Sequence, residues 1–149
     1  MEEKLSSGIE YGFLGMAVIS SFTCLVRTDF NFAFALLCYY LWHNANAKEE
    51  DRESIGKKLI LLNAALAVLD LIWLITMGSV WSSTPEKNQD LWDELSGIHS
   101  FALFFSWINW LIRAAIIGAL VYMFKEIVKN PKSLISGEAG YDMGSINPN

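Results

Sequence analysis

The feature that most constrains the fold is an arginine, Arg113, in the middle of the apolar segment 100–124. A helix of this length extends about 37 Å, which is enough to cross a bilayer with some tilt. A cation near the centre of such a span costs about 2.5–3.5 kcal/mol on insertion scales, so it should have a partner inside the protein. The sequence therefore predicts a membrane span that packs against at least one other helix.

The candidate partner is Asp70, the other charged residue that lies deep within an apolar segment. Asp70 lies twelve residues after Lys58, where its segment begins, and Arg113 lies twelve residues before Lys125, where the other segment ends. In two antiparallel helices both side chains would lie about 18 Å from the same membrane face. We expect an intramembrane ion pair that joins the third and fourth spans, with a proton or ion relay and a lipid-headgroup site as alternatives.

Four apolar segments, separated by charged connections, give the chain the composition of an integral membrane protein. Of its 149 residues 53% are hydrophobic, and its net charge of -5 offers no basic surface for nucleic acid. The pattern predicts an all-α integral membrane protein in which four transmembrane helices form a small bundle. The predicted spans are about 8–26, 30–47, 59–81 and 100–124, within a transmembrane domain of residues 1–130 that is followed by a polar C-terminal tail, 131–149.

The connections between the spans predict how the helices are arranged. The three residues that follow the first span can join only antiparallel helices, and the charged connection 48–58 is either a helical extension or a short solvated loop. After the third span, Thr84 and Pro85 are typical of a helix start, and Gly97 can end that helix. We expect a short interfacial helix on the membrane surface between spans three and four.

Positive charges near the ends of the spans predict the orientation of the chain. Eight lie in the head, the second connection and the tail, against Arg27 and Lys87 on the other side. Both termini should therefore face the cytosol, or the matrix if the membrane is the mitochondrial inner membrane. The eight residues are Lys4, Lys48, Arg52, Lys57, Lys58, Lys125, Lys129 and Lys132.

Small residues within the spans predict where helices approach one another closely. Gly8, Gly12 and Gly15 lie on nearly one face of the first span, and Ala114 with Gly118 forms a similar pair in the fourth. Such stripes allow two backbones to come into contact. We expect both to be helix contacts.

Polar residues in the third and fourth spans predict hydrogen bonds between helices. Asn63 shares a helical face with Asp70, and Ser106 and Asn109 share a face with Arg113. Polar side chains inside an apolar helix usually face the bundle rather than lipid. We interpret Asn63, Ser106 and Asn109 as interhelical contacts.

The sequence contains no motif that indicates catalysis. It has no phosphate-binding loop, no GxSxG and no HExxH, and Cys24 and Cys38 are not spaced for metal or redox chemistry. His43 and His99 are expected at opposite membrane faces and so could not act together. We expect a non-enzyme without a metal or cofactor, although bound lipid is compatible with the sequence.

The order of these features resembles the type-1 angiotensin II receptor-associated protein family. The resemblance covers residues 8–125 and includes FNFAFALLCYYLW in the second span, ESI in the charged connection, LDLIW in the third span and ALVYMFKE at the end of the fourth. The family has a lysine followed by a proline where this chain has Arg113 and Ala114, so the cation is kept and the proline is lost. The resemblance implies an endomembrane adaptor of the ER, Golgi or vesicles whose cytosolic tail engages a receptor.

We therefore expect a non-catalytic adaptor that acts through protein contacts in the bilayer and through its tail. Its partners would be membrane lipids and other integral membrane proteins. An alternative is an accessory subunit of a large membrane assembly, such as a respiratory complex or an ATPase. An ion or proton carrier is a third hypothesis, less favoured because the spans hold few polar residues to line a path.

Overall fold

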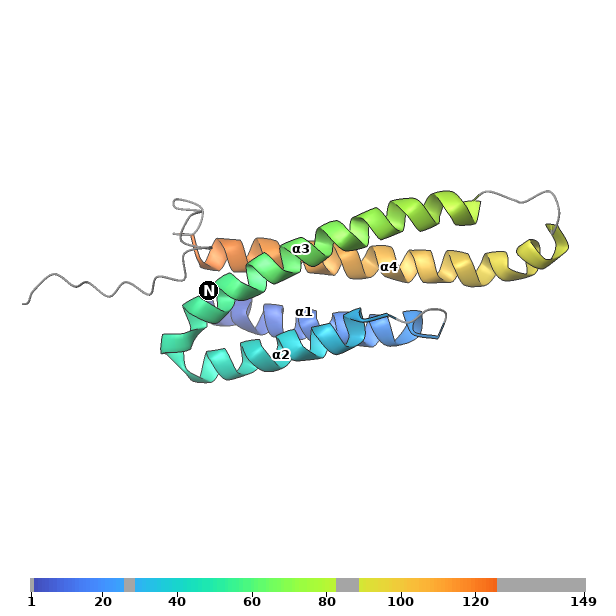
Figure 1. Ribbon diagram of the computed structural model, residues 1–149. Coiled ribbons are helices and arrows are strands. Elements are labelled where there is room, and N and C mark those ends of the chain that lie inside the picture. Colours follow the sequence, from blue (N-terminus) through green and yellow to red (C-terminus); the bar gives the residue numbers. More distant parts are fainter. Residues whose placement is uncertain (1, 26–28, 83–88, 126–149) are drawn as a thin grey trace, which may run out of the picture.

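The computed structural model describes residues 2–25, 29–82 and 89–125, without the side chains of 49, 50, 82 and 89–94. This part of the chain forms four α-helices and no strand (Figure 1). The predicted all-helical class is thus confirmed. The helices are α1 (Glu2–Thr23), α2 (Asn31–Ala47), α3 (Glu49–Ser82) and α4 (Gln89–Met123).

Two of the four helices are long and apolar enough to cross a bilayer. The candidate spans are Asp51–Trp81 in α3 and Leu95–Met123 in α4. The other two helices do not meet this measure of length and composition. α2 has only 17 residues, and α1 carries Glu10 and an acidic first turn. Each predicted span thus corresponds to a helix, but only α3 and α4 have the character of a full crossing.

The helices form a bundle in which α1 contacts α2 and α4, and α3 contacts α2 and α4. The chain reverses direction between successive helices, so neighbours are antiparallel (Figure 1). At one end all four helices meet around Trp42, which is fully buried. Its indole nitrogen donates a hydrogen bond to the backbone oxygen of Ser6 at 3.1 Å, and the ring of Phe124 packs edge-on against it.

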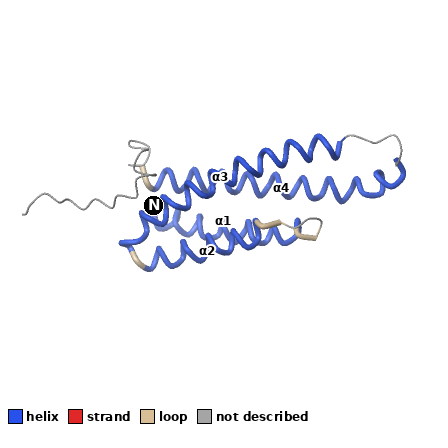
Figure 2. The backbone as a smooth tube through the Cα atoms, viewed as in Figure 1, coloured by secondary structure: helices blue, strands red, loops and turns tan. Residues whose placement is uncertain are grey.

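The α1–α2 hairpin is shorter than α3 and α4 (Figure 2). Phe22, in the last turn of α1, stacks on Phe105 of α4, and Asn31, the first residue of α2, contacts Asp70 of α3. Beyond these contacts α3 continues for about 18 Å, and α4 begins about 24 Å away from Phe105. Residues 71–82 and 89–104 therefore form a two-helix extension, which we call the α3–α4 arm (Figure 1).

The predicted interfacial helix between the third and fourth spans is wrong. α4 runs without interruption from Gln89 to Met123, so Gly97 lies inside a helix instead of ending one. A glycine inside a helix costs about 1 kcal/mol relative to alanine, which the apolar residues on either side can offset. The predicted start at Thr84 and Pro85 lies outside the described residues, as does the tail 131–149.

The charged connection before the third span is a helical extension, one of the two predicted forms. α3 begins at Glu49, ten residues before the apolar segment starts at Leu59. Lys57 and Glu53 form an ion pair of 2.7 Å across one helical turn, an arrangement that stabilises an exposed helix by a few tenths of a kcal/mol. This extension places the basic residues of α3 at the same end of the bundle as Trp42.

Apolar side chains cover the outside of the bundle as well as its core. The interior contains Phe13, Met16 and Leu120, all fully buried. Large apolar side chains are also exposed on every helix, and the examples include Val18, Leu37, Leu69, Ile75 and Leu111. Large apolar side chains exposed on all four helices indicate contact with lipid or with another protein.

Candidate functional site

A cluster of buried polar residues lies inside the bundle at the level where the α1–α2 hairpin ends. At its centre is Arg113 of α4, whose side chain is fully buried. Its Nη2 atom lies 3.3 Å from the Oδ2 atom of Asp70 on α3, whose side chain is 13% exposed. The structure therefore brings together the two charged residues that the sequence predicted as partners.

Asn31 of α2 connects the two charged residues, because its amide contacts both. The side-chain nitrogen donates to both carboxylate oxygens of Asp70, at 3.3 and 3.4 Å, and the side-chain oxygen accepts a hydrogen bond from Arg113. The three residues belong to three different helices. Asn31 lies within the second predicted span, 30–47, and the sequence predicted no role for it. The one sequence signal for such a role was the position of Asn31, a polar amide at the start of an otherwise apolar helix.

Asp29 adds a second carboxylate next to this cluster and fixes the hairpin end. One oxygen accepts the backbone N–H of Asn31 at 3.0 Å, and the other accepts the Thr23 hydroxyl at 2.6 Å. A carboxylate that accepts an N–H at the start of a helix satisfies a donor that the helix leaves unpaired, and its negative charge interacts favourably with the positive end of the helix dipole. Asp29 therefore joins the end of α1 to the start of α2, a role that sequence analysis missed.

Arg113 has further N–H groups that no described residue accepts. Its Nε and Nη1 atoms are buried and lack a hydrogen-bond partner in the described part of the chain. The ring of Phe34 lies 5.6 Å from the guanidinium carbon, which places aromatic π density against the cation. Buried N–H groups of this kind usually bind water.

A second polar contact joins α1 to α4 beside this cluster. The amide nitrogen of Asn109 donates to the hydroxyl of Ser20 at 2.6 Å, and both side chains are buried. Ser106 is buried on the same face of α4, and its hydroxyl has no partner among the described residues. Of the two predicted contacts on α4, the structure gives Asn109 a partner on another helix and Ser106 none.

Asn63 of α3 bonds mainly to its own helix. Its amide nitrogen donates to the backbone oxygen of Leu59 at 2.9 Å and lies 3.8 Å from the sulfur of Cys38 on α2. The contact with Cys38 is the interhelical part of this arrangement. Both cysteines are free thiols, Cys38 buried and Cys24 exposed.

Among the predicted small residues, Gly12 lies at a close helix contact. A Cβ atom there would lie 2.9 Å from Ile116 of α4. A Cβ at Gly8, Gly15 or Gly118 would meet nothing within 4 Å, and Ala114 is exposed. Gly12 therefore explains the close approach of α1 to α4. The other predicted small residues are not at close helix contacts.

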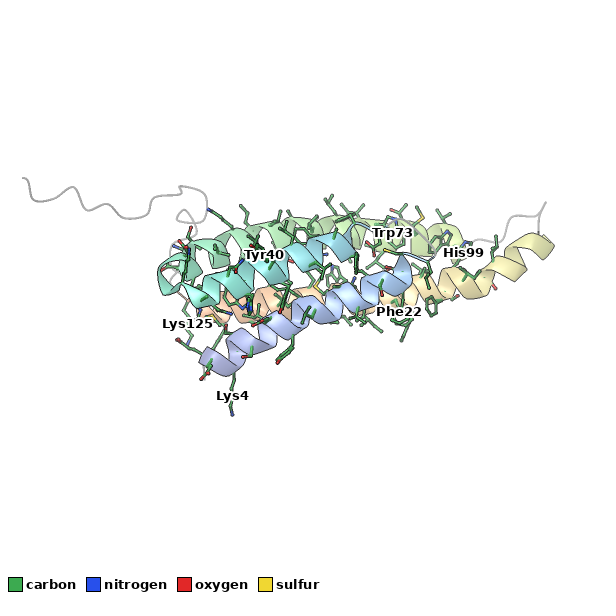
Figure 3. The ribbon with its side chains drawn as sticks, turned by 90° about the horizontal axis from the view of Figure 1, so that it is seen from below. Lys4, Phe22, Tyr40, Trp73, His99 and Lys125 are labelled. Atoms are coloured by element: carbon green, nitrogen blue, oxygen red, sulfur yellow. The ribbon has the colours of Figure 1, made fainter. Side chains whose placement is uncertain are left out.

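The two histidines lie near opposite ends of the bundle, so they do not contact each other. His43 is 2.7 Å from Glu10 near the end where Trp42 is buried, whereas His99 stacks on Trp81 at 4.5 Å within the α3–α4 arm. Figure 3 shows His99 at the end opposite Lys4 and Lys125. Among the described residues, no group of three or more His, Cys, Asp or Glu side chains could hold a metal ion.

The fold and the polar cluster define a helical protein with two candidate membrane spans. No protein-family model matches the sequence, and no curated protein or solved structure is significantly similar to it. The resemblance to the angiotensin receptor-associated family therefore stays a prediction from the sequence.

Proposed function

We propose that the protein is a non-catalytic membrane adaptor that binds other integral membrane proteins through helix contacts. The supporting observation is that its buried polar side chains form contacts between helices. Asn31, Asp70 and Arg113 contact one another across α2, α3 and α4, and Asn109 bonds to Ser20 across α4 and α1. Polar groups that join helices in this way stabilise a specific bundle.

The surface offered to a partner is the α3–α4 arm. The arm lies beyond the α1–α2 hairpin, so neither α1 nor α2 covers its outer faces (Figure 1). Its exposed apolar side chains include Ile72, Ile75, Val80, Ile98 and Phe101. In a bilayer a partner helix can replace lipid on such a surface.

In the proposed membrane arrangement all four helices are embedded, and α3 and α4 cross the bilayer completely. The α1–α2 hairpin enters from the side that carries Lys57 and Lys125. That side faces the cytosol by the distribution of positive charge, with both termini on it. We propose an endomembrane location, with a receptor as the partner that the family resemblance suggests. The alternative is an accessory subunit of a complex in the mitochondrial inner membrane.

The test is site-specific photocrosslinking in native membranes. A photoreactive amino acid at Ile75, which is 63% exposed on the arm, should give one discrete adduct with an integral membrane protein that mass spectrometry identifies. The matched control is Leu37 on α2, which is 50% exposed and should crosslink mainly to lipid. Lipid adducts alone at both positions would contradict the adaptor proposal.

A second candidate function, an ion or proton carrier, is favoured by one observation. Buried atoms of Arg113, Asn63 and Asn109 lack hydrogen-bond partners among the described residues and would bind water inside the bundle. Purified protein in liposomes should conduct no ions if it is an adaptor. A flux that disappears in Asp70→Asn would support the carrier instead.

A further inference from the structure

A groove of about 270 Å³ runs along the outer surface between α1 and α4. Gly8 and Gly12 line it on α1, and Ala115 and Ala119 line it on α4. The close approach of Gly12 to Ile116 holds the two helices together, while a Cβ at Gly8 would meet nothing within 4 Å. The small side chains therefore leave an apolar groove on the outer surface, along the line where α1 packs against α4.

One end of this groove is basic. Lys4 lines the groove there, one helical turn before Gly8. Lys125 lies at the same end of the molecule, with its ammonium group 4.3 Å from the centre of the Tyr122 ring (Figure 3). Both lysines are exposed.

The acidic residues of α1 lie on a different flank of the helix. Glu2, Glu3 and Glu10 line a separate polar pocket together with Arg52 of α3. The first turns of α1 thus direct carboxylates towards α2 and the start of α3, and a lysine towards α4. This separation leaves positive charge at the end of the apolar groove.

We propose that the groove binds an anionic phospholipid, with one acyl chain along the glycines and alanines and the phosphate near Lys4 and Lys125. The inference rests on the proposed location in a membrane. An apolar groove with an exposed lysine at its end, Lys4, and a second, Lys125, at the same end of the molecule matches a ligand with a hydrocarbon chain and an anionic head. Lys57 and Lys58 of α3 lie towards the same end, which is where lipid headgroups would be.

The test is native mass spectrometry of the detergent-purified protein with two added lipids, phosphatidylglycerol and phosphatidylcholine with identical acyl chains. Each lysine near an anionic surface favours binding by about fivefold. We expect the wild type to prefer phosphatidylglycerol and Lys4→Gln with Lys125→Gln to lose that preference. The matched control, Lys58→Gln, removes an exposed lysine of α3, a helix that does not line the groove, and should keep the preference.

A second pair of variants tests the apolar part of the groove. Ala119→Phe fills the groove and should reduce binding of both lipids, whereas Ala65→Phe, at an exposed position of α3, should not. If Ala119→Phe fails to fold, the variants of the two exposed lysines still test the lipid site, because their replacement leaves the core intact.

Three results would overturn the lipid site. The first is equal binding of the two lipids by the wild type. The second is a preference for phosphatidylglycerol that survives replacement of both lysines. The third is a homodimer that Ala119→Phe dissociates, which would mean that a second copy of the chain occupies the groove. A protein that stays soluble and monomeric without detergent would instead contradict the membrane location itself.

Discussion

At the scale of single residues, Asn31 changes the interpretation of the ion pair. The sequence predicted that Asp70 and Arg113 would meet, because two charges stranded at equal depth in apolar segments have few other partners. It did not predict Asn31 or Asp29, because their contacts depend on how far the α1–α2 hairpin reaches and how its helices are rotated. Hydrophobicity patterns do not determine either quantity.

Replacing one member of the ion pair should cost more stability than replacing both. Breaking a buried pair typically costs about 3–5 kcal/mol, whereas apolar replacement of both partners can be nearly neutral. Asp70→Leu should be the worse single change, because it leaves the buried cation of Arg113 unpaired. The measurement is a double-mutant cycle on unfolding in detergent. Additive losses in the Asp70→Leu, Arg113→Leu double variant would mean that the two charges do not interact.

Asn31→Ala should destabilise the bundle even though both charges remain. The change removes hydrogen bonds to Asp70 and Arg113, and buried groups that lose a partner cost about 1–3 kcal/mol. The matched control is Asn44→Ala on the same helix, where the side chain is exposed. Thermal unfolding in detergent should show a lower midpoint for the first variant only. Equal midpoints would show that the amide contributes nothing to the cluster.

At the scale of helices, the sequence predicted where apolar helices occur along the chain. It did not predict how far each helix is shifted along its axis relative to its neighbours. The apolar segment 59–81 lies within α3, and the segment 100–124 lies in α4 up to the last residue of that helix, Met123, since length and composition determine such helices. The close contact at Gly12 was also predictable from small-residue spacing. Gly56 was not, because it lies in the charged connection and its neighbour, Phe124, is near the far end of α4.

Gly56→Ala should destabilise the end of the bundle where the four helices meet. A methyl group there would collide with the ring of Phe124, which packs edge-on against Trp42. Overpacking of this kind typically costs about 1–3 kcal/mol. Gly118→Ala is the matched control, since a Cβ at Gly118 meets nothing within 4 Å. It should be neutral or stabilise α4 by up to about 1 kcal/mol. A Gly56→Ala variant as stable as Gly118→Ala would contradict this packing.

At the scale of the whole molecule, the positive charges and the long helices together predict a topology. Lys48, between α2 and α3, and Ser96, near the start of α4, lie at opposite ends of α3 and α4. Lys48→Cys should react with an impermeant maleimide from the cytosolic side and Ser96→Cys from the other side. Reaction of both from one side would mean that α3 and α4 do not cross the membrane.

The depth of the α1–α2 hairpin gives the sharpest test of the membrane arrangement. Trp81 stacks on His99, and Phe105, which contacts Phe22 in the last turn of α1, lies six residues further along α4. The hairpin therefore ends about 9 Å short of the Trp81–His99 level. If aromatic residues at that level mark the membrane surface, Cys24 lies within hydrocarbon.

Native Cys24 should therefore resist impermeant maleimide in intact membranes, although its side chain is exposed in the protein. A thiol needs water to ionise, and the thiolate is the form that reacts. Detergent should make Cys24 reactive, while Cys38, fully buried in the bundle, should stay unreactive until unfolding. Ser96→Cys is the positive control for an exposed site on the arm. Labelling of Cys24 as fast as this control would place the hairpin end in water and make all four helices complete spans, as the sequence alone predicted.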